Sequence, residues 1–187
     1  MSNIEYIINS EGASVFIIRN WLSDSEELKD KLKNTVEWKQ YSGKAYDKEY
    51  LVPRRMYPCG EISNYYNSDV NPWINEVKDI KDRIENEFNI QLNSCVLNEY
   101  RDGKDYIAYH SDREVLGTNN VVVSVSLGGP RDFYMKSKIN IKTTIKTQVR
   151  SGDLMAMSGR TQKLYTHSVP KRAHANYRIS LTYRLSK

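Results

Sequence analysis

The sequence predicts an α+β fold that is mainly β: a double-stranded β-helix, or jelly roll, with two helices packed on one outer face. From residue 94 onward, short apolar segments are separated by turns that contain glycine, at Gly103, Gly117, Gly128-Gly129-Pro130 and Gly152. Only two segments before residue 94 have the apolar spacing of an amphipathic helix. Many short strands with so few helices are typical of a double-sheet architecture.

The first half of the chain is predicted to contain both helices. Residues 4–18 read as short extended segments. Ser23-Asp-Ser-Glu26 has the pattern of a capping box, and the apolar residues after it predict a helix over about 24–36, with the stripe Leu28, Leu32 and Val36. Proline is favoured in the first turn of a helix, so Pro72 predicts the start of a second one, with the buried stripe Ile74, Val77, Ile80, Ile84 and Phe88.

Two segments between these helices are interpreted as surface structure. Residues 38–52 are polar and rich in tyrosine, with one glycine, Gly43, which suits an exposed hairpin or flap. The run Val52-Pro-Arg-Arg-Met-Tyr-Pro-Cys-Gly60 reads as a basic loop.

The second half is predicted to form strands over 94–100, 106–110, 121–127, 133–138, 139–149, 154–157 and 178–185. Within 139–150, isoleucine and valine alternate with lysine, asparagine, glutamine and arginine. This alternation predicts a half-buried strand whose outer face is cationic, with Lys142 and Lys146.

Length and charge narrow the class of protein. The 187 residues fit one domain, and we expect a monomer. A net charge of +5 favours polyanionic partners but is also an ordinary solubility feature. The 14 tyrosines could stack on bases, although tyrosine is equally common in half-exposed cores.

Neither a signal peptide nor a membrane span is expected, because the chain shows no charged leader with an apolar run and no stretch of about eighteen apolar residues. Cys59 and Cys95 lack metal-type spacing and agree with a reducing compartment. We therefore expect a soluble intracellular protein, cytoplasmic or nuclear.

A metal centre is suggested by His110-Ser-Asp112 together with His167. A His-x-Asp pair on an extended strand points both side chains to the same face. Two imidazoles and one carboxylate on one face of an iron leave three positions open for a bidentate co-substrate and dioxygen. By itself the pair also fits a hydrogen-bonded surface turn.

The C-terminal strand adds a candidate anion site. Arg178, Ser180, Thr182 and Arg184 fall on one face of this strand, and apolar residues fall on the other. Two inward-facing guanidinium groups need anionic partners, and a small dicarboxylate would suit them. A solvent-facing edge strand is the alternative.

These residues belong to an ordered series of motifs that resembles the AlkB-type Fe(II)- and 2-oxoglutarate-dependent dioxygenases, and most closely the DNA-repair branch. The series is Asn98-Glu-Tyr100-Arg-Asp-Gly103, His110-x-Asp112-x-Glu114, Ser124-Val-Ser126-Leu-Gly128, Arg131-Asp132-Phe133, Ser151-Gly-Asp153-Leu-Met-x-Met157, Tyr165-x-His167-Ser-Val-Pro170 and Arg178-x-Ser-Leu-Thr-Tyr-Arg184. It spans residues 98–184. The resemblance divides the single domain into 1–93, with the helices and a nucleotide-recognition flap, and 94–187, with the catalytic jelly roll.

The resemblance implies Fe(II) and 2-oxoglutarate as cofactors. His110, Asp112 and His167 would be the catalytic metal ligands, and His174 is left out as a surface or phosphate-contacting residue. Arg178 and Tyr100 would bind the distal carboxylate of 2-oxoglutarate, and Asn98 and Arg184 would act near the end that chelates the metal. The family usually has asparagine where this chain has Ser180, which affects one hydrogen bond to the co-substrate.

The resemblance also implies oxidative demethylation of N-alkylated bases, with release of succinate, CO2 and formaldehyde. Glu114 would meet the polar edge of the base, and Arg54 would line the base pocket. Tyr57, Tyr65 and Tyr66 are the candidates to stack on the flipped base, and Arg54, Arg55, Lys171 and Arg172 form a candidate basic rim. DNA is the expected partner.

Three alternatives remain open from the sequence. They are an RNA demethylase, a 2-oxoglutarate-dependent hydroxylase of a protein side chain, and a catalytically silent β-domain that binds nucleic acid. The complete set of metal-ligand and arginine positions disfavours the third.

Overall fold

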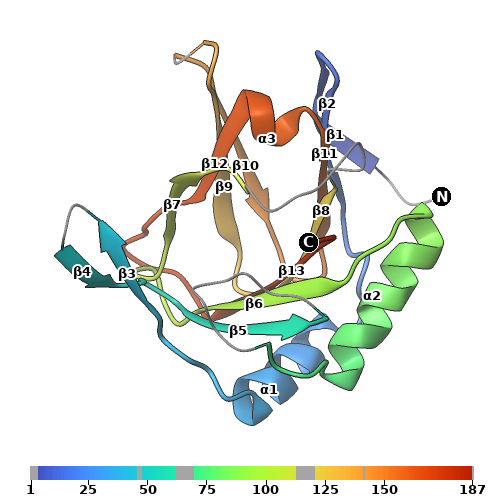
Figure 1. Ribbon diagram of the computed structural model, residues 1–187, viewed down its shortest axis with the longest axis vertical. Coiled ribbons are helices and arrows are strands. Elements are labelled where there is room, and N and C mark those ends of the chain that lie inside the picture. The colour runs from blue at the N-terminus through green and yellow to red at the C-terminus, as the bar shows by residue number, and fades with distance from the viewer. Residues whose placement is uncertain (1–3, 46–47, 62–69, 113–120, 141, 187) are drawn as a thin grey trace.

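The computed structural model describes residues 4–45, 48–61, 70–112, 121–140 and 142–186 (Figure 1). Its elements in chain order are β1 (Ile4–Ser10), β2 (Ala13–Ile18), α1 (Ser25–Thr35), β3 (Ser42–Ala45), β4 (Lys48–Leu51), β5 (Arg55–Gly60), α2 (Asn75–Phe88), β6 (Ser94–Tyr100), β7 (Ile107–His110), β8 (Val122–Gly128), β9 (Arg131–Ser137), β10 (Thr144–Val149), β11 (Leu154–Gly159), α3 (Thr161–Leu164), β12 (Tyr165–Val169) and β13 (Arg178–Arg184).

The strands form two large sheets and one hairpin. The larger sheet has the order β1-β2-β11-β8-β13-β6-β5, the smaller sheet has the order β10-β9-β12-β7, and β3 pairs with β4. Neighbouring strands in these sheets run antiparallel. The mainly β prediction is confirmed, and the two facing sheets are consistent with a jelly roll.

Apolar side chains gather in two main clusters that follow these layers. One cluster joins Leu28 and Leu32 of α1 and Val77, Ile80 and Ile84 of α2 to the outer face of the larger sheet. Both helices lie on that side in Figure 1. The second cluster fills the space between the two sheets, with members such as Phe133, Met135, Met155 and Met157. Burial of apolar surface on both faces of the larger sheet fixes the position of its central strands.

The larger sheet draws on both halves of the sequence. β1, β2 and β5 come from residues before 93, and they form part of the same sheet as β6, β8, β11 and β13. Residues 55–60, interpreted as a basic loop, are strand β5 because Tyr57 and Cys59 contribute apolar faces opposite Leu97 and Cys95 of β6. The sequence did not predict this strand because the segment contains polar residues.

Other local expectations also differ from the structure, and α2 begins at Asn75, three residues after Pro72. Glu26 does not close a capping box, because its carboxylate accepts hydrogen bonds from Lys29 Nζ (2.6 Å) and Ser151 Oγ (2.5 Å), and Asp24 is the N-cap without a side-chain bond. The predicted strand over 139–149 begins only at Thr144. Ile139 is 72% exposed and lies in the turn from β9, where backbone N–H groups donate to Ser137 Oγ.

None of the helices in the described ranges combines the length and apolar character needed to cross a bilayer.

Candidate active site

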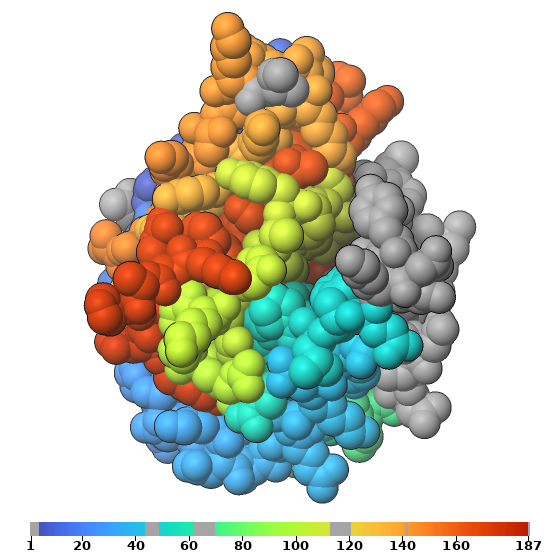
Figure 2. Space-filling view, turned by 90° about the vertical axis from the view of Figure 1, so that its left-hand side faces the viewer, coloured from blue at the N-terminus to red at the C-terminus, as the bar shows by residue number. Residues whose placement is uncertain are grey.

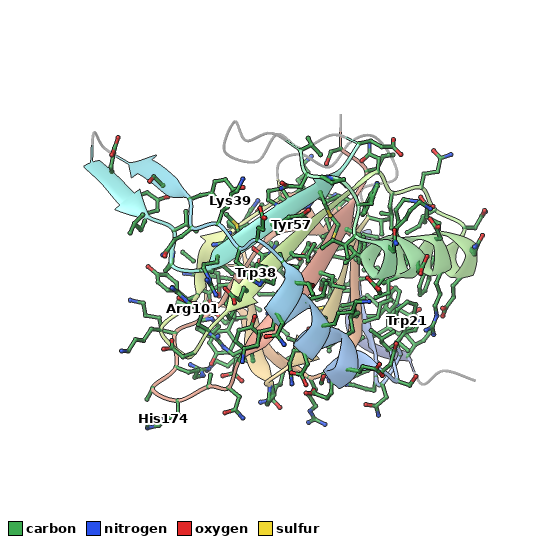
Figure 3. The ribbon with its side chains drawn as sticks, turned by 90° about the horizontal axis from the view of Figure 1, so that it is seen from below. Trp21, Trp38, Lys39, Tyr57, Arg101 and His174 are labelled. Carbon is green, nitrogen blue, oxygen red and sulfur yellow. The ribbon has the colours of Figure 1, made fainter. Side chains whose placement is uncertain are left out.

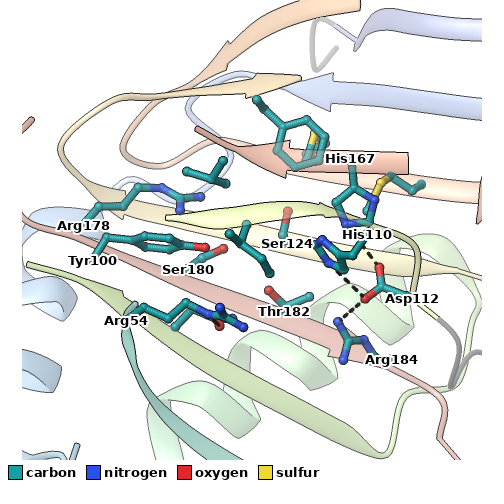
Figure 4. Close-up of a pocket in the computed structure, with 16 residues that line it drawn as sticks. Arg54, Tyr100, His110, Asp112, Ser124, His167, Arg178, Ser180, Thr182 and Arg184 are labelled. Carbon is teal, nitrogen blue, oxygen red and sulfur yellow. Dashed lines mark hydrogen bonds and ion pairs between the residues drawn. The ribbon is translucent and has the colours of Figure 1, made fainter. Parts of the chain in front are cut away.

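The three predicted metal ligands meet at one point between the sheets (Figure 4). β7 and β12 are antiparallel neighbours in the smaller sheet, and their register places His110 opposite His167. The two ring centroids are 4.2 Å apart. Asp112 follows His110 by two residues, and the candidate ligand atoms of the three side chains all lie within 4.8 Å of one another. Ligands that are 57 residues apart in sequence therefore share one site because two strands pair.

The Asp112 carboxylate is held by two other side chains. Arg184 Nη2 donates to Asp112 Oδ1 over 2.7 Å, and Gln162 Nε2 donates to Asp112 Oδ2 over 3.2 Å. Gln162 Oε1 also accepts the Asp112 backbone N–H at 3.0 Å. Burial by itself raises the pKa of Asp112, but Arg184, the two histidines and the Gln162 hydrogen bond together hold the pKa below its usual value. The carboxylate is thus ionised and oriented, as a metal ligand must be.

Both histidines are neutral at physiological pH. Burial lowers the pKa of His167 to about 3, because a charged imidazole would lose its hydration, and burial also lowers the pKa of His110. His110 Nδ1 lies 3.0 Å from the carbonyl oxygen of Ala108, so a proton on Nδ1 donates there and leaves Nε2 as a free lone pair. Neutral imidazole nitrogens beside a carboxylate fit an Fe(II) ion.

The opposite end of the cavity carries a buried guanidinium with unmet hydrogen-bonding capacity. Arg178 is 3% exposed, and its Nη2 donates to Ser126 Oγ over 2.9 Å. Its Nε and Nη1 are buried and have no partner among the described residues. The Tyr100 ring lies 5.1 Å from the guanidinium carbon. Because an uncompensated buried cation is costly, this end of the cavity fits a carboxylate from a bound molecule.

Polar side chains from the central strands line the middle of the cavity. Asn98 Oδ1 accepts a hydrogen bond from Arg54 Nε at 2.8 Å. Ser180 lies between Asn98 of β6 and Ser126 of β8 in the sheet register. Among the described residues, the cavity is lined by Arg54, Asn98, Tyr100, Ile107, His110, Asp112, Ser124, Phe133, Met155, Met157, His167, Val169, Arg178, Ser180, Thr182 and Arg184. The predicted metal and cofactor residues are therefore all brought together.

The predicted substrate residues divide into three groups. Arg54 is 6% exposed and lines the cavity. Tyr57 does not line it: its side chain packs on the helix-covered face of β5 (Figure 3), because successive residues of a strand point to opposite faces. Stacking on a base in this cavity is therefore not available to Tyr57. Tyr65, Tyr66 and Glu114 lie outside the described residues.

The predicted basic rim is largely paired within the protein. Arg55 forms a bidentate ion pair with the fully buried Glu99, and Arg172 pairs with Asp132. The exposed Lys171 lies over the ring of Tyr106, 4.6 Å from its centroid. His174 lies on an outer loop away from the metal ligands (Figure 3), in agreement with its exclusion from the metal site.

Gln162 is a site residue that the sequence analysis missed. It lies on α3, a four-residue helix between β11 and β12, and contacts Asp112 through both ends of its amide. A single glutamine in a short polar segment gives no signal of such a contact. The stacked ring of Phe133, 5.4 Å from the His167 ring, belongs to a motif that the sequence analysis recognised.

Comparison with known proteins identifies the class to which this site belongs. The family model of the 2OG-Fe(II) oxygenase superfamily matches residues 14–184, and the chain belongs to this superfamily. Fe(II) and 2-oxoglutarate are accordingly its cofactors, as the sequence motifs implied.

More particular similarities point to the AlkB homologues. The chain is 33% identical over 177 residues to "Alpha-ketoglutarate-dependent dioxygenase alkB homolog 3" of Mus musculus, covering 87% of this chain and 62% of that protein. It is 37% identical over 119 residues to "DNA oxidative demethylase ALKBH2" of Arabidopsis thaliana, covering 51% of this chain and 38% of that protein. The chain thus spans about three-fifths of the length of the mouse relative.

A solved structure supports the fold independently. The structure of OsALKBH1 superposes with a TM-score of 0.69 at 18% identity, covering 97% of this chain and 99% of that chain. At this identity the likeness concerns the fold alone.

Proposed function

We propose that this chain is an Fe(II)- and 2-oxoglutarate-dependent dioxygenase that dealkylates N-alkylated bases in nucleic acid, with DNA repair as its role. The main observation behind this proposal is a single cavity, one end of which suits a metal ion and the other end a carboxylate. A His-Asp-His group lies at one end, and the unsatisfied donors of Arg178 lie at the other. The similar proteins include a DNA oxidative demethylase, which supports nucleic acid as the substrate.

The residues of the cavity would divide the binding of the cofactors between them. His110, Asp112 and His167 would hold Fe(II) on one face. Arg178 would grip the distal carboxylate of 2-oxoglutarate with a planar fork of N–H groups, beside the ring of Tyr100. Asn98, Ser180 and Arg184 would contact the co-substrate nearer the metal. When bound, Fe(II) with 2-oxoglutarate and dioxygen supplies the oxidation of a C–H bond, and 2-oxoglutarate is converted to succinate and CO2.

The protein's own contribution is orientation and exclusion of water. Phe133, Met155, Met157 and Val169 give the cavity an apolar wall beside the metal ligands. Arg184 and Gln162 fix the orientation of the Asp112 carboxylate, which with His110 and His167 would hold Fe(II). An N-methyl group held there would gain one oxygen atom, and the resulting N-hydroxymethyl group would be lost as formaldehyde.

The target base must leave its stack to reach a cavity of this kind. Arg54 is buried and lines the cavity, and it would contact the base there. Glu114 is proposed to meet the polar edge of the base, and Tyr65 or Tyr66 to stack on it. The flap and the jelly roll would then form one catalytic domain.

A panel of methylated oligonucleotides tests this function. DNA and RNA strands that carry single N-methylated bases, their unmethylated controls and a methylated peptide are incubated with Fe(II), 2-oxoglutarate and dioxygen. We expect formaldehyde and succinate in equal amounts from at least one methylated strand and no formaldehyde from unmethylated strands. Formaldehyde or hydroxylated product from the peptide alone would replace this function with that of a protein oxygenase.

A further inference from the structure

A second hollow adjoins the cofactor cavity at the β7 edge of the smaller sheet, beside the segment that joins β4 to β5. Three residues, Arg54, Ile107 and His110, line both the cavity and this hollow. In Figure 2, atoms of the β4–β5 region (cyan) and of the β7 region (yellow-green) lie side by side on this face. His110, a predicted metal ligand, has a side chain that is 32% exposed, so the hollow leads directly to the metal end of the cavity.

The wall of this hollow is unusually rich in tyrosine. Tyr50 comes from β4, and Tyr106 and Tyr109 come from the segment that enters and forms β7. Tyr50 is 48% exposed and Tyr109 is 46% exposed, although both are large aromatic side chains. Exposed aromatic rings beside a site with a polar opening mark a binding surface more often than a folding requirement.

Two of these tyrosines have close contacts with neighbouring segments. Gly43 stands opposite Tyr50 in the β3–β4 register, and the Tyr50 ring lies where a Cβ on residue 43 would be, 2.5 Å from Cζ. Only glycine allows that ring position. The backbone N–H of Tyr106 donates to the carbonyl of Pro53 at 2.9 Å, which joins the segment before β7 to the segment before β5.

The charge around the hollow suits a polyanion. None of its lining residues in the described part of the chain is acidic, and Arg54 is at its inner edge. Lys171 reaches over the ring of Tyr106 from the neighbouring loop. Aromatic faces with adjoining cations are the combination that binds single-stranded nucleic acid, since every base offers a π-face.

We propose that this hollow binds a nucleotide next to the reactive one in a single strand, with its base stacked on Tyr109 and with Tyr50 as the second aromatic wall. This inference rests on the proposed function and assigns a binding site to residues outside the cofactor cavity. A base that remains paired and stacked in a duplex cannot occupy the hollow. The strand must therefore be unpaired at the reactive nucleotide and also at one neighbour.

Abasic neighbours test the site without changing the reactive base. Single-stranded oligonucleotides carry one methylated base and an abasic residue on its 5′ side, on its 3′ side or on neither. For the wild-type protein, we expect kcat/KM for formaldehyde release to fall on the order of tenfold when the abasic residue is on one particular side. Tyr109→Ala should lower kcat/KM by a similar factor on the complete strand and should show almost no further loss with the abasic neighbour.

Two further variants separate stacking from damage to the fold. Tyr109→Phe keeps the ring and should restore the wild-type sensitivity, and Tyr6→Ala removes a tyrosine that is 56% exposed on β1 and should match the wild type. The Mn(II) affinity of Tyr109→Ala should equal that of the wild type, which shows that the adjoining His110 is undisturbed.

The outcomes distinguish this inference from the proposed function. If wild-type protein releases formaldehyde from methylated strands but is indifferent to abasic neighbours on both sides, the stacking site is wrong and the function stands. The stacking site would also be wrong if an abasic neighbour lowered kcat/KM by the same factor in the wild type and in Tyr109→Ala. If no strand yields formaldehyde and a methylated peptide does, the stacking site and the proposed function are both wrong.

Discussion

The two arginines of β13 lie on one face of the same strand, six residues apart, and their surroundings differ. Arg184 is paired with Asp112, which is itself a candidate metal ligand. Arg178 is equally buried, but two of its nitrogen atoms lack a partner among the described residues. The metal end of the cavity is therefore held in position by the protein itself, whereas the other end depends on a bound anion to complete its hydrogen bonds.

The largest expected effect follows from breaking the metal end. Asp112→Ala and His167→Ala should each abolish Fe(II)-dependent succinate formation, because two remaining ligands cannot hold the ion on one face. The measurement is succinate yield together with Mn(II) binding by calorimetry. His174→Ala, at an exposed outer loop, should retain both. Loss of metal binding in His174→Ala, with retention in Asp112→Ala, would show that the ligands are assigned wrongly.

A smaller effect is expected at the residue that orients Asp112. Gln162→Leu removes two hydrogen bonds to Asp112 while keeping a side chain of similar size. Loss of such an outer partner should weaken Mn(II) binding roughly 10- to 100-fold. Gln162→Glu, whose carboxylate repels that of Asp112, should be at least as weak. Wild-type metal affinity in both variants would mean that Arg184 alone is sufficient to orient Asp112.

Gln162 also shows which kind of site residue cannot be predicted from the sequence. The metal ligands and Arg178 belong to motifs of fixed order, and the mainly β fold follows from apolar periodicity. Gln162 reaches Asp112 only because α3 folds beside β12, a contact across 50 residues with no local pattern. Tyr57 was misplaced for a similar reason. The face on which a side chain of β5 lies depends on its pairing with β6, and this segment had been interpreted as a loop.

Low pH should destabilise the metal-free protein, because His167 at the metal end of the cavity is neutral in the folded state. Burial lowers the pKa of His167 to about 3 from a usual value of 6.5. Between these values the unfolded chain binds a proton at this position that the folded chain does not. The contribution of neutral His167 to stability is therefore complete above pH 6.5, and stability should fall by about 1.4 kcal/mol per pH unit below it. Urea unfolding with a chelator present measures this, and His167→Gln should flatten the dependence, whereas His174→Gln should not. If the free energy of unfolding of His167→Gln depended on pH as that of the wild type does, another group would cause the acid sensitivity.

The smallest expected effect is on the salt dependence of oligonucleotide binding, and it comes from the charge of Lys171. Because Arg55 and Arg172 are paired within the protein, Lys171 is the member of the predicted rim placed to contact a phosphate. Lys171→Ala should reduce the slope of log affinity against log salt by about one for a single-stranded oligonucleotide. Lys142→Ala, in the exposed turn before β10, is the matched control. Equal slopes for wild type and Lys171→Ala would remove this contact.

The contrast between the two arginines can be measured directly by titrating Mn(II) and then 2-oxoglutarate into Arg178→Lys and Arg184→Lys. Lysine keeps the charge but loses the planar fork. For Arg178→Lys we predict unchanged Mn(II) and oligonucleotide affinity, with 2-oxoglutarate binding weakened roughly 10- to 100-fold. For Arg184→Lys we predict weakened Mn(II) binding before any 2-oxoglutarate is added. If Arg178→Lys bound 2-oxoglutarate as tightly as the wild type, or if both variants weakened the metal equally, the division of the cavity into these two ends would be contradicted.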